Sequence, residues 1–264
     1  MDSPFRSDQH AFFEEHGWLV LRGVVSGRPL TRMTEAFDEA LRPHLKGDMP
    51  CDARGRSIWQ VPGLCHHSEI LMTHVHGGLA VLVADLLEAG RTQLLQDTLM
   101  VKPARVGAPV ELHQDYTYIG YLQPTKAVSV RLSLTASTAE TGCMYVIDRS
   151  HRWGLQGDLS VFSDRLQEGT VERLPAKLRE RVAEDRIPLA LQPGDVSIHH
   201  CLTHHGSFEN TSGTTLKTIV THIFDGACRL APERLPYGAI QYFATDADGG
   251  LSPASFPVLF DRSA

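Results

Sequence analysis

The residues best suited to chemistry in this sequence are His113 and Asp115, separated by one residue, and a histidine-rich run at 199–207. Side chains alternate between the two faces of a β-strand, so positions 113 and 115 can point the same way from one strand end. A further imidazole from the distal run would place two nitrogens and one carboxylate around one ion. That donor set, with open positions opposite, is typical of a non-haem Fe(II) oxygenase site.

The distal run offers four histidines, at 199, 200, 204 and 205. On regular strands, 199 and 200 point to opposite faces, as do 204 and 205, so at most one of each pair faces the ion. Periodicity does not select among them. A His-x-Asp pair is also expected by chance in a 264-residue chain with 14 histidines, where it is ordinarily a surface histidine beside a capping aspartate. The surrounding elements must therefore carry the argument.

Composition bounds the kind of protein. The net charge is −6 and no basic block occurs, which argues against a nucleic-acid partner. Five cysteines without a Cys-x-x-Cys pair indicate neither a disulfide framework nor a zinc ribbon. The N-terminus lacks the apolar run of a secretory signal, and no stretch approaches the ~20 apolar residues that span a bilayer. We expect a cytoplasmic protein with no membrane association; a homo-oligomer is compatible with the sequence.

The first ninety or so residues read mainly as helical. Residues 8–16 predict a short helix ending at Gly17, 18–25 a buried strand, and the segment from Pro29 a second helix. Residues 43–68 show little periodicity and predict a long loop, either a functional loop or a simple surface excursion. Residues 69–89 predict a helix interrupted at Gly77-Gly78.

From residue 92 onward, short apolar runs separated by Gly and Pro predict β-strands. A helical insertion is expected at 175–184 and an irregular tail from 231. No linker divides the chain, so we expect a single domain over 1–264, mainly β with flanking helices: a helical N-terminal layer on a double-stranded β-helix, the jelly roll or cupin-like fold. The predicted strands cover 92–102, 110–112, 127–135, 143–147, 186–191, 196–201 and 216–224.

The strand at 127–135 alternates cleanly, with aliphatic residues on one face and Ser129, Arg131, Ser133 and Thr135 on the other. The polar face is either solvated or lines an interior cavity. In the second case Arg131 would be a buried cation in need of an anion, such as a dicarboxylate. The strand at 216–224 carries a lone cation, Lys217, which is either exposed or a second candidate.

The chain resembles the phytanoyl-CoA dioxygenase family of Fe(II)- and 2-oxoglutarate-dependent oxygenases over residues 8–225. The resemblance rests on five segments in the family's order. They are Phe13-Glu14-Glu15-His16-Gly17-Trp18, Val101-Lys102-Pro103 with the His-Gln-Asp motif, Thr141-Gly142-Cys143-Met144, Ser150-His151-Arg152-Trp153-Gly154, and Pro193-Gly194-Asp195 followed by Thr203-His204-His205-Gly206-Ser207.

This resemblance implies Fe(II), 2-oxoglutarate and O2 as cofactors, with iron held by His113, Asp115 and His205. It also implies that Ser207 and Thr98 contact 2-oxoglutarate. The family's arginine after the distal histidine is replaced here by Leu216. Either Lys217, one residue further on, or Arg131, on a neighbouring strand, would then bind the far carboxylate; we favour Arg131.

The expected reaction is hydroxylation of an unactivated C–H bond in a small-molecule substrate, specialised or lipid-like, with release of succinate and CO2; desaturation and cyclisation are alternatives. Gln96, Tyr116, Tyr118 and the loop at 43–68 are the expected substrate contacts. The resemblance also implies oxygen chemistry over halogenation, because halogenating relatives carry a small residue where this sequence has Asp115. Two other hypotheses stay open: a jelly-roll metalloprotein with the same triad that does not use 2-oxoglutarate, and a binding protein without enzyme activity.

Overall fold

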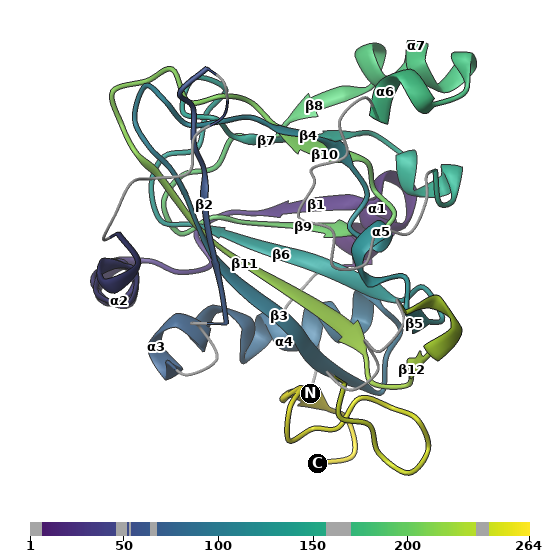
Figure 1. Ribbon diagram of the computed structural model, residues 1–264. Helices are drawn as coiled ribbons and strands as arrows, with labels where there is room; N and C mark the ends of the chain where they lie inside the picture. Colours follow the sequence, from purple (N-terminus) through teal and green to yellow (C-terminus); the bar gives the residue numbers. More distant parts are fainter. Residues whose placement is uncertain (1–6, 46–51, 53, 64–67, 157–169, 236–242) are drawn as a thin grey trace.

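The computed structural model describes residues 7–45, 52, 54–63, 68–156, 170–235 and 243–264. Two antiparallel sheets make up most of it. The smaller of the two lies at the top of the view in Figure 1. The larger sheet runs in the order β1-β9-β6-β11-β3-β13, with β2 also paired to β3, and the smaller runs β4-β10-β7-β8. These sheets, with the solved structures described below, confirm the predicted mainly-β jelly roll.

The strands of the larger sheet are β1 (Trp18–Leu21), β2 (Trp59–Pro62), β3 (Arg91–Lys102), β6 (Ala127–Ser133), β9 (Val196–His200), β11 (Leu216–Asp225) and β13 (Val258–Asp261). Those of the smaller sheet are β4 (Val110–His113), β7 (Met144–Ile147), β8 (Arg186–Pro188) and β10 (His205–Ser207). A two-stranded ribbon joins β5 (Leu122–Gln123) and β12 (Arg229–Leu230).

The helices are α1 (Ser7–His16), α2 (Gly27–Leu41), α3 (Glu69–Met72), α4 (Gly78–Leu86), α5 (Tyr116–Ile119), α6 (Thr170–Arg173) and α7 (Ala176–Glu184). Short 3₁₀ turns lie at η1 (Arg42–Leu45), η3 (Thr73–Val75), η4 (Ser150–Trp153) and η5 (Pro232–Arg234). The break between η3 and α4 falls at Gly77, whose φ of 64° suits glycine, as the sequence predicts.

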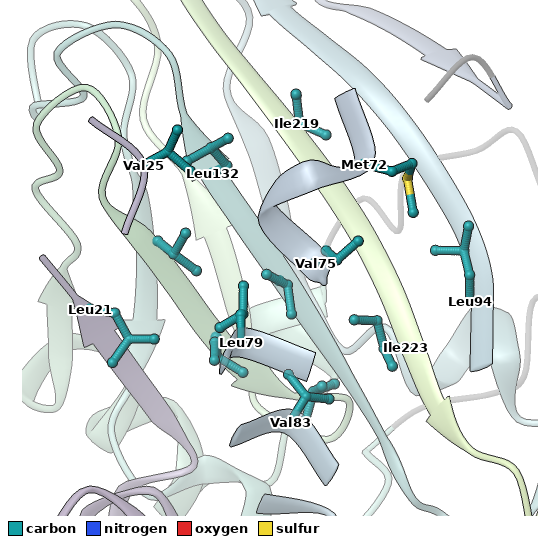
Figure 2. Packing of buried hydrophobic residues seen from close by; sticks show 14 of the residues in the cluster. Leu21, Val25, Met72, Val75, Leu79, Val83, Leu94, Leu132, Ile219 and Ile223 are labelled. Atoms are coloured by element: carbon teal, nitrogen blue, oxygen red, sulfur yellow. The ribbon is translucent and has the colours of Figure 1, made fainter. Parts of the chain in front are cut away.

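One face of the larger sheet packs against helices α2, α3 and α4 and forms the main hydrophobic core. Figure 2 shows helical side chains such as Val75 and Val83 gathered with Leu132, Ile219 and Ile223 of the sheet. In β6 the even positions from 128 to 132 enter this core. The odd positions therefore face the other way, toward the smaller sheet, and this is the side on which the site lies.

Three predicted segments differ from the structure. The strand predicted at 18–25 ends at Leu21. The Gly23 backbone N–H donates to Asp195, and Arg22 forms an ion pair with the same carboxylate, so the chain turns after Leu21. The predicted loop at 43–68 contains β2, paired to β3; its residues 46–51, 53 and 64–67 lie outside the described part. The tail expected to be irregular contains β13, which also pairs with β3.

No single helix in the described part of the chain is long and apolar enough to cross a bilayer. The bent pair formed by residues 69–75 and 78–86 meets the criterion by length and composition alone, and most of its apolar side chains lie in the core.

The buried histidine His74 makes stability depend on pH. Its Nδ1 donates to the Leu71 carbonyl, its Nε2 has no partner, and burial lowers its pKa to about 4. The unfolded chain, with an ordinary pKa near 6.5, then binds more protons between pH 6.5 and 4, so the folded state loses stability as the pH falls through this window.

We predict that His74→Leu reduces the loss of unfolding free energy between pH 7 and 5 by about 1.5 kcal/mol. Urea denaturation at both pH values measures the free energy of unfolding. His44→Gln, at an exposed position, is the control and should show the wild-type difference between the two pH values. An unchanged pH dependence in His74→Leu would show that His74 is not a neutral buried group.

Candidate metal centre and its cavity

Two histidines from neighbouring strands of the smaller sheet face each other at the centre of the site. His113 on β4 pairs in register with His205 on β10, and their ring centroids are 4.2 Å apart. The Nδ1 of each ring lies close to the carbonyl two residues earlier, Glu111 at 2.8 Å and Thr203 at 2.9 Å. With Nδ1–H donating to these carbonyls, each Nε2 keeps its lone pair, as a metal ligand requires.

Asp115 supplies the carboxylate, from the turn that begins α5. Its Oδ1 lies 3.5 Å from His113 Nε2 and 3.4 Å from His205 Nε2, and the three donor atoms lie within 4.8 Å of one another. Burial raises the pKa of Asp115, but the positive charge and N–H groups of the adjacent histidines, when these are protonated, outweigh it and hold that pKa well below the usual range. Two neutral imidazoles and a carboxylate fit a divalent iron ion.

The intervening Gln114 points away from the other two and fixes the motif. Its amide donates to the carbonyls of Gly154 and Leu202, and its Oε1 accepts from the Gln156 backbone. This residue ties the ligand turn to two other loops, so the positions of His113 and Asp115 do not depend on α5 alone.

A row of polar residues across the larger sheet holds the second oxygen of Asp115. Ser129 Oγ donates to Oδ2, His199 Nε2 lies 3.0 Å from it and His222 Nε2 lies 3.6 Å from it. These three residues are cross-strand neighbours on β6, β9 and β11. With Oδ2 occupied in this way, Oδ1 is the oxygen left for a metal.

The four histidines of the distal run are now separated by role. His205 joins the donor cluster, and His199 on the same side contacts Asp115. His200 turns toward His151, and His204 packs against the Trp153 ring. The alternation predicted from sequence holds, and the geometry selects the same distal histidine as the family resemblance.

A cavity of about 590 Å³ opens between the two sheets beside this cluster. Arg131 lines it from β6, with 5 % of its surface exposed and its Nη2 buried without a hydrogen-bond partner. Burial lowers the pKa of Arg131 to about 10, so the guanidinium stays charged at neutral pH. No carboxylate among the described residues forms an ion pair with it. Of the polar face of the strand at 127–135, Ser129 and Arg131 thus line a cavity.

Most of the other predicted site residues line the same cavity, but two do not. Gln96, Thr98, Tyr118 and Ser207 line it. Tyr116 is not among the lining residues. It is buried in the hydrophobic cluster beside the cavity, where its hydroxyl donates to the Leu122 carbonyl and accepts from Gln123.

Lys217 does not reach the cavity either. Its Nζ lies 2.5 Å from Asp38 on α2. Val220 and His222 of β11 line the cavity, and position 217 has the opposite parity to them, so its side chain points to the helical side. A shift by one residue from the family's arginine position therefore changes the face of the sheet, and Lys217 is not among the residues that line the cavity.

Sequence reasoning missed His222 and Lys102, and it named His199 only as a candidate ligand and Gln60 only as part of the loop at 43–68. Gln60 lines the cavity from β2, within the segment predicted as a loop. Lys102 is fully buried and contacts Ser207. The signal for Lys102 was available, because it shares the parity of the cavity-lining residues Gln96, Thr98 and Met100 on β3.

Comparison with known proteins agrees with this geometry. The model of the family described as Phytanoyl-CoA dioxygenase (PhyH) matches residues 13–217. Phytanoyl-CoA dioxygenase 1 of Oryza sativa is 29% identical over 51% of this chain, a match that covers 46% of the rice protein. The peroxisomal phytanoyl-CoA dioxygenase of Mus musculus is 22% identical over 84% of this chain and 69% of the mouse protein.

Solved structures show the same fold. The non-heme alpha ketoglutarate dependent carbocyclase SnoK from nogalamycin biosynthesis superposes with a TM-score of 0.78, at 19% identity, over 97% of both chains. EctD from S. alaskensis, solved with 2-oxoglutarate and 5-hydroxyectoine, gives 0.71 at 20% identity over 87% of this chain and 79% of its own. Because the family model matches well over half of the sequence, the chain belongs to the phytanoyl-CoA dioxygenase family.

Proposed function

We propose that this protein is an Fe(II)- and 2-oxoglutarate-dependent dioxygenase that hydroxylates an unactivated C–H bond of a small molecule. The observation that carries the proposal is the combination, in one cavity, of the His113–Asp115–His205 cluster with a buried Arg131 whose Nη2 has no partner. A metal centre alone would not need a buried cation, and a buried guanidinium without an anion is costly.

His113, Asp115 and His205 would hold the iron. When bound, iron together with 2-oxoglutarate supplies the activation of O2 for C–H oxidation, with succinate and CO2 as co-products. The chain's own task is positioning. The Nδ1–H bonds to Glu111 and Thr203 set the orientation of both rings, and Ser129 with His199 sets that of Asp115.

Arg131 would bind the far carboxylate of 2-oxoglutarate. Its planar guanidinium can donate two parallel hydrogen bonds to a carboxylate, which gives both affinity and direction. Ser207 and Thr98, which line the same cavity, offer hydroxyl groups to the same ligand. The cation absent from position 216 would thus be supplied from the neighbouring strand.

The rest of the cavity suits an uncharged substrate. Apart from histidines, Asp115 and Arg131 are the charged residues among the described lining, and the metal and cosubstrate would match both. The groups left over are amides and hydroxyls, with apolar surface between them. They would bind hydroxyl or carbonyl substituents and exclude water from the reacting C–H bond. The amides and hydroxyls are those of Gln60, Gln96, Tyr118 and Tyr121, and Met100 and Ile119 supply apolar surface.

The proposal is tested by adding 2-oxoglutarate to the Fe(II)-loaded protein under argon and then admitting O2. We expect a weak visible charge-transfer band on addition, followed by formation of succinate. Iron-loaded protein that gives neither would favour the alternative, a metalloprotein with this triad that does not use 2-oxoglutarate.

Iron binding itself gives a second prediction. His113→Ala, Asp115→Ala and His205→Ala should each abolish stoichiometric Fe(II) binding, because each removes one of three protein ligands. Metal analysis after gel filtration measures it. His200→Gln is the matched control, since His200 faces away from the cluster and its substitution should leave iron binding intact. Stoichiometric iron in His205→Ala would contradict the assignment.

The two candidate cations give a third prediction. Arg131→Leu should weaken 2-oxoglutarate binding about a hundredfold, the cost of removing one partner of a buried charge pair. Lys217→Leu should leave the affinity unchanged, because Lys217 pairs with Asp38. Anaerobic titration of the charge-transfer band measures both. The reverse pattern, with the loss in Lys217→Leu, would refute the role of Arg131.

A further inference from the structure

Lys102, at the end of β3, is a second buried basic residue next to the cavity. Its side chain is fully enclosed, and its Nζ donates to Ser207 Oγ at 2.7 Å and to the Phe208 carbonyl at 2.5 Å. No carboxylate among the described residues forms an ion pair with it. Burial, and to a lesser extent Arg131, lower the pKa of Lys102 to about 7. The fold therefore keeps two buried basic side chains close together without a carboxylate partner among the described residues.

The path of this lysine is built into the surrounding loops. A Cβ on Gly142 would lie 2.9 Å from Lys102 Cδ, and one on Gly107 would lie 2.9 Å from Lys102 Cβ. Gly142 also has a φ of +87°, which favours glycine. The two glycines leave room for the aliphatic stem, so Nζ reaches Ser207, while Lys102 itself is not among the residues that line the cavity.

The hydrogen bonds of Ser207 then fix the direction of its hydroxyl. A serine hydroxyl has one proton to donate and two lone pairs to accept with. Lys102 Nζ and the Val110 backbone N–H, at 3.2 Å, both donate to Ser207 Oγ. Both lone pairs are therefore used, and the proton remains. Ser207 lines the cavity, so its hydroxyl can serve only as a donor toward an acceptor in that space.

Resting on the proposed use of 2-oxoglutarate, we infer that Lys102 is a positioning residue that makes Ser207 an obligatory donor to the cosubstrate's far carboxylate. Ser207 and Arg131 would then approach that carboxylate from the smaller and the larger sheet. Lys102 acts through Ser207 and does not touch the ligand. Its contribution should vanish for a 2-oxo acid that has no far carboxylate.

The test compares 2-oxoglutarate with 2-oxopentanoate, which carries a methyl group in place of the far carboxylate. Both are titrated anaerobically into Fe(II)-loaded protein by the charge-transfer band. Lys102→Met, which keeps the aliphatic stem, should weaken 2-oxoglutarate about tenfold, as expected for a lost hydrogen bond to a charged group, and leave 2-oxopentanoate unchanged. Ser207→Ala should show the same selectivity, and the double variant should be no weaker than Ser207→Ala alone.

Three results would overturn the inference. Equal weakening of both 2-oxo acids would make Lys102 a general structural residue. Additive losses in the double variant would mean that Lys102 does not act through Ser207. Loss of iron binding in both Lys102→Met and Lys102→Gln would give it a role in folding instead. If the wild-type protein gives no charge-transfer band with either acid, the proposed function itself fails. Failure of the inference about Lys102 can therefore be distinguished from failure of the proposed function.

Discussion

The strict alternation of side chains along β6 and its neighbours is the constraint on which the rest of the structure depends. Val128, Val130 and Leu132 face the helices, and Ser129 and Arg131 face the cavity. A shift of one residue would bury the guanidinium in the aliphatic core and expose the valines to the cavity. The strand register that places the aliphatic residues in the core therefore also places Ser129 and Arg131 in the cavity.

The buried polar groups of the site lower the stability of the fold. Arg131 and Lys102 are buried without carboxylate partners among the described residues, and ring nitrogens of His199 and His222 are buried without a hydrogen bond. Such groups reduce stability unless a ligand satisfies them. The large aliphatic cluster on the other face of the sheet supplies stability that offsets this cost. It shares no residue with the cavity, so the polar groups of the site do not disturb its packing. Bound ligands should therefore stabilise the protein.

The sequence allows the strands and the metal-ligand motif to be predicted because their signals are local. The alternation at 127–135 and the spacing of His113 and Asp115 need no knowledge of distant residues. The contacts of His199 and His222 with Asp115 could not be predicted, because they depend on cross-strand register between β6, β9 and β11. Lys217 lies on the helical side of the sheet, as the alternation along β11 already indicated, so the structure favours Arg131 over it. Tyr116 follows the ligand aspartate directly, but the turn into α5 carries it away from the cavity.

A crystal structure of the anaerobic complex with Fe(II) and 2-oxoglutarate tests the central claim most directly. We predict metal bound by His113, Asp115 Oδ1 and His205, with the far carboxylate of 2-oxoglutarate hydrogen bonded to Arg131. Metal at these ligands but a carboxylate held by another cation, with Arg131 still unpartnered, would contradict the account.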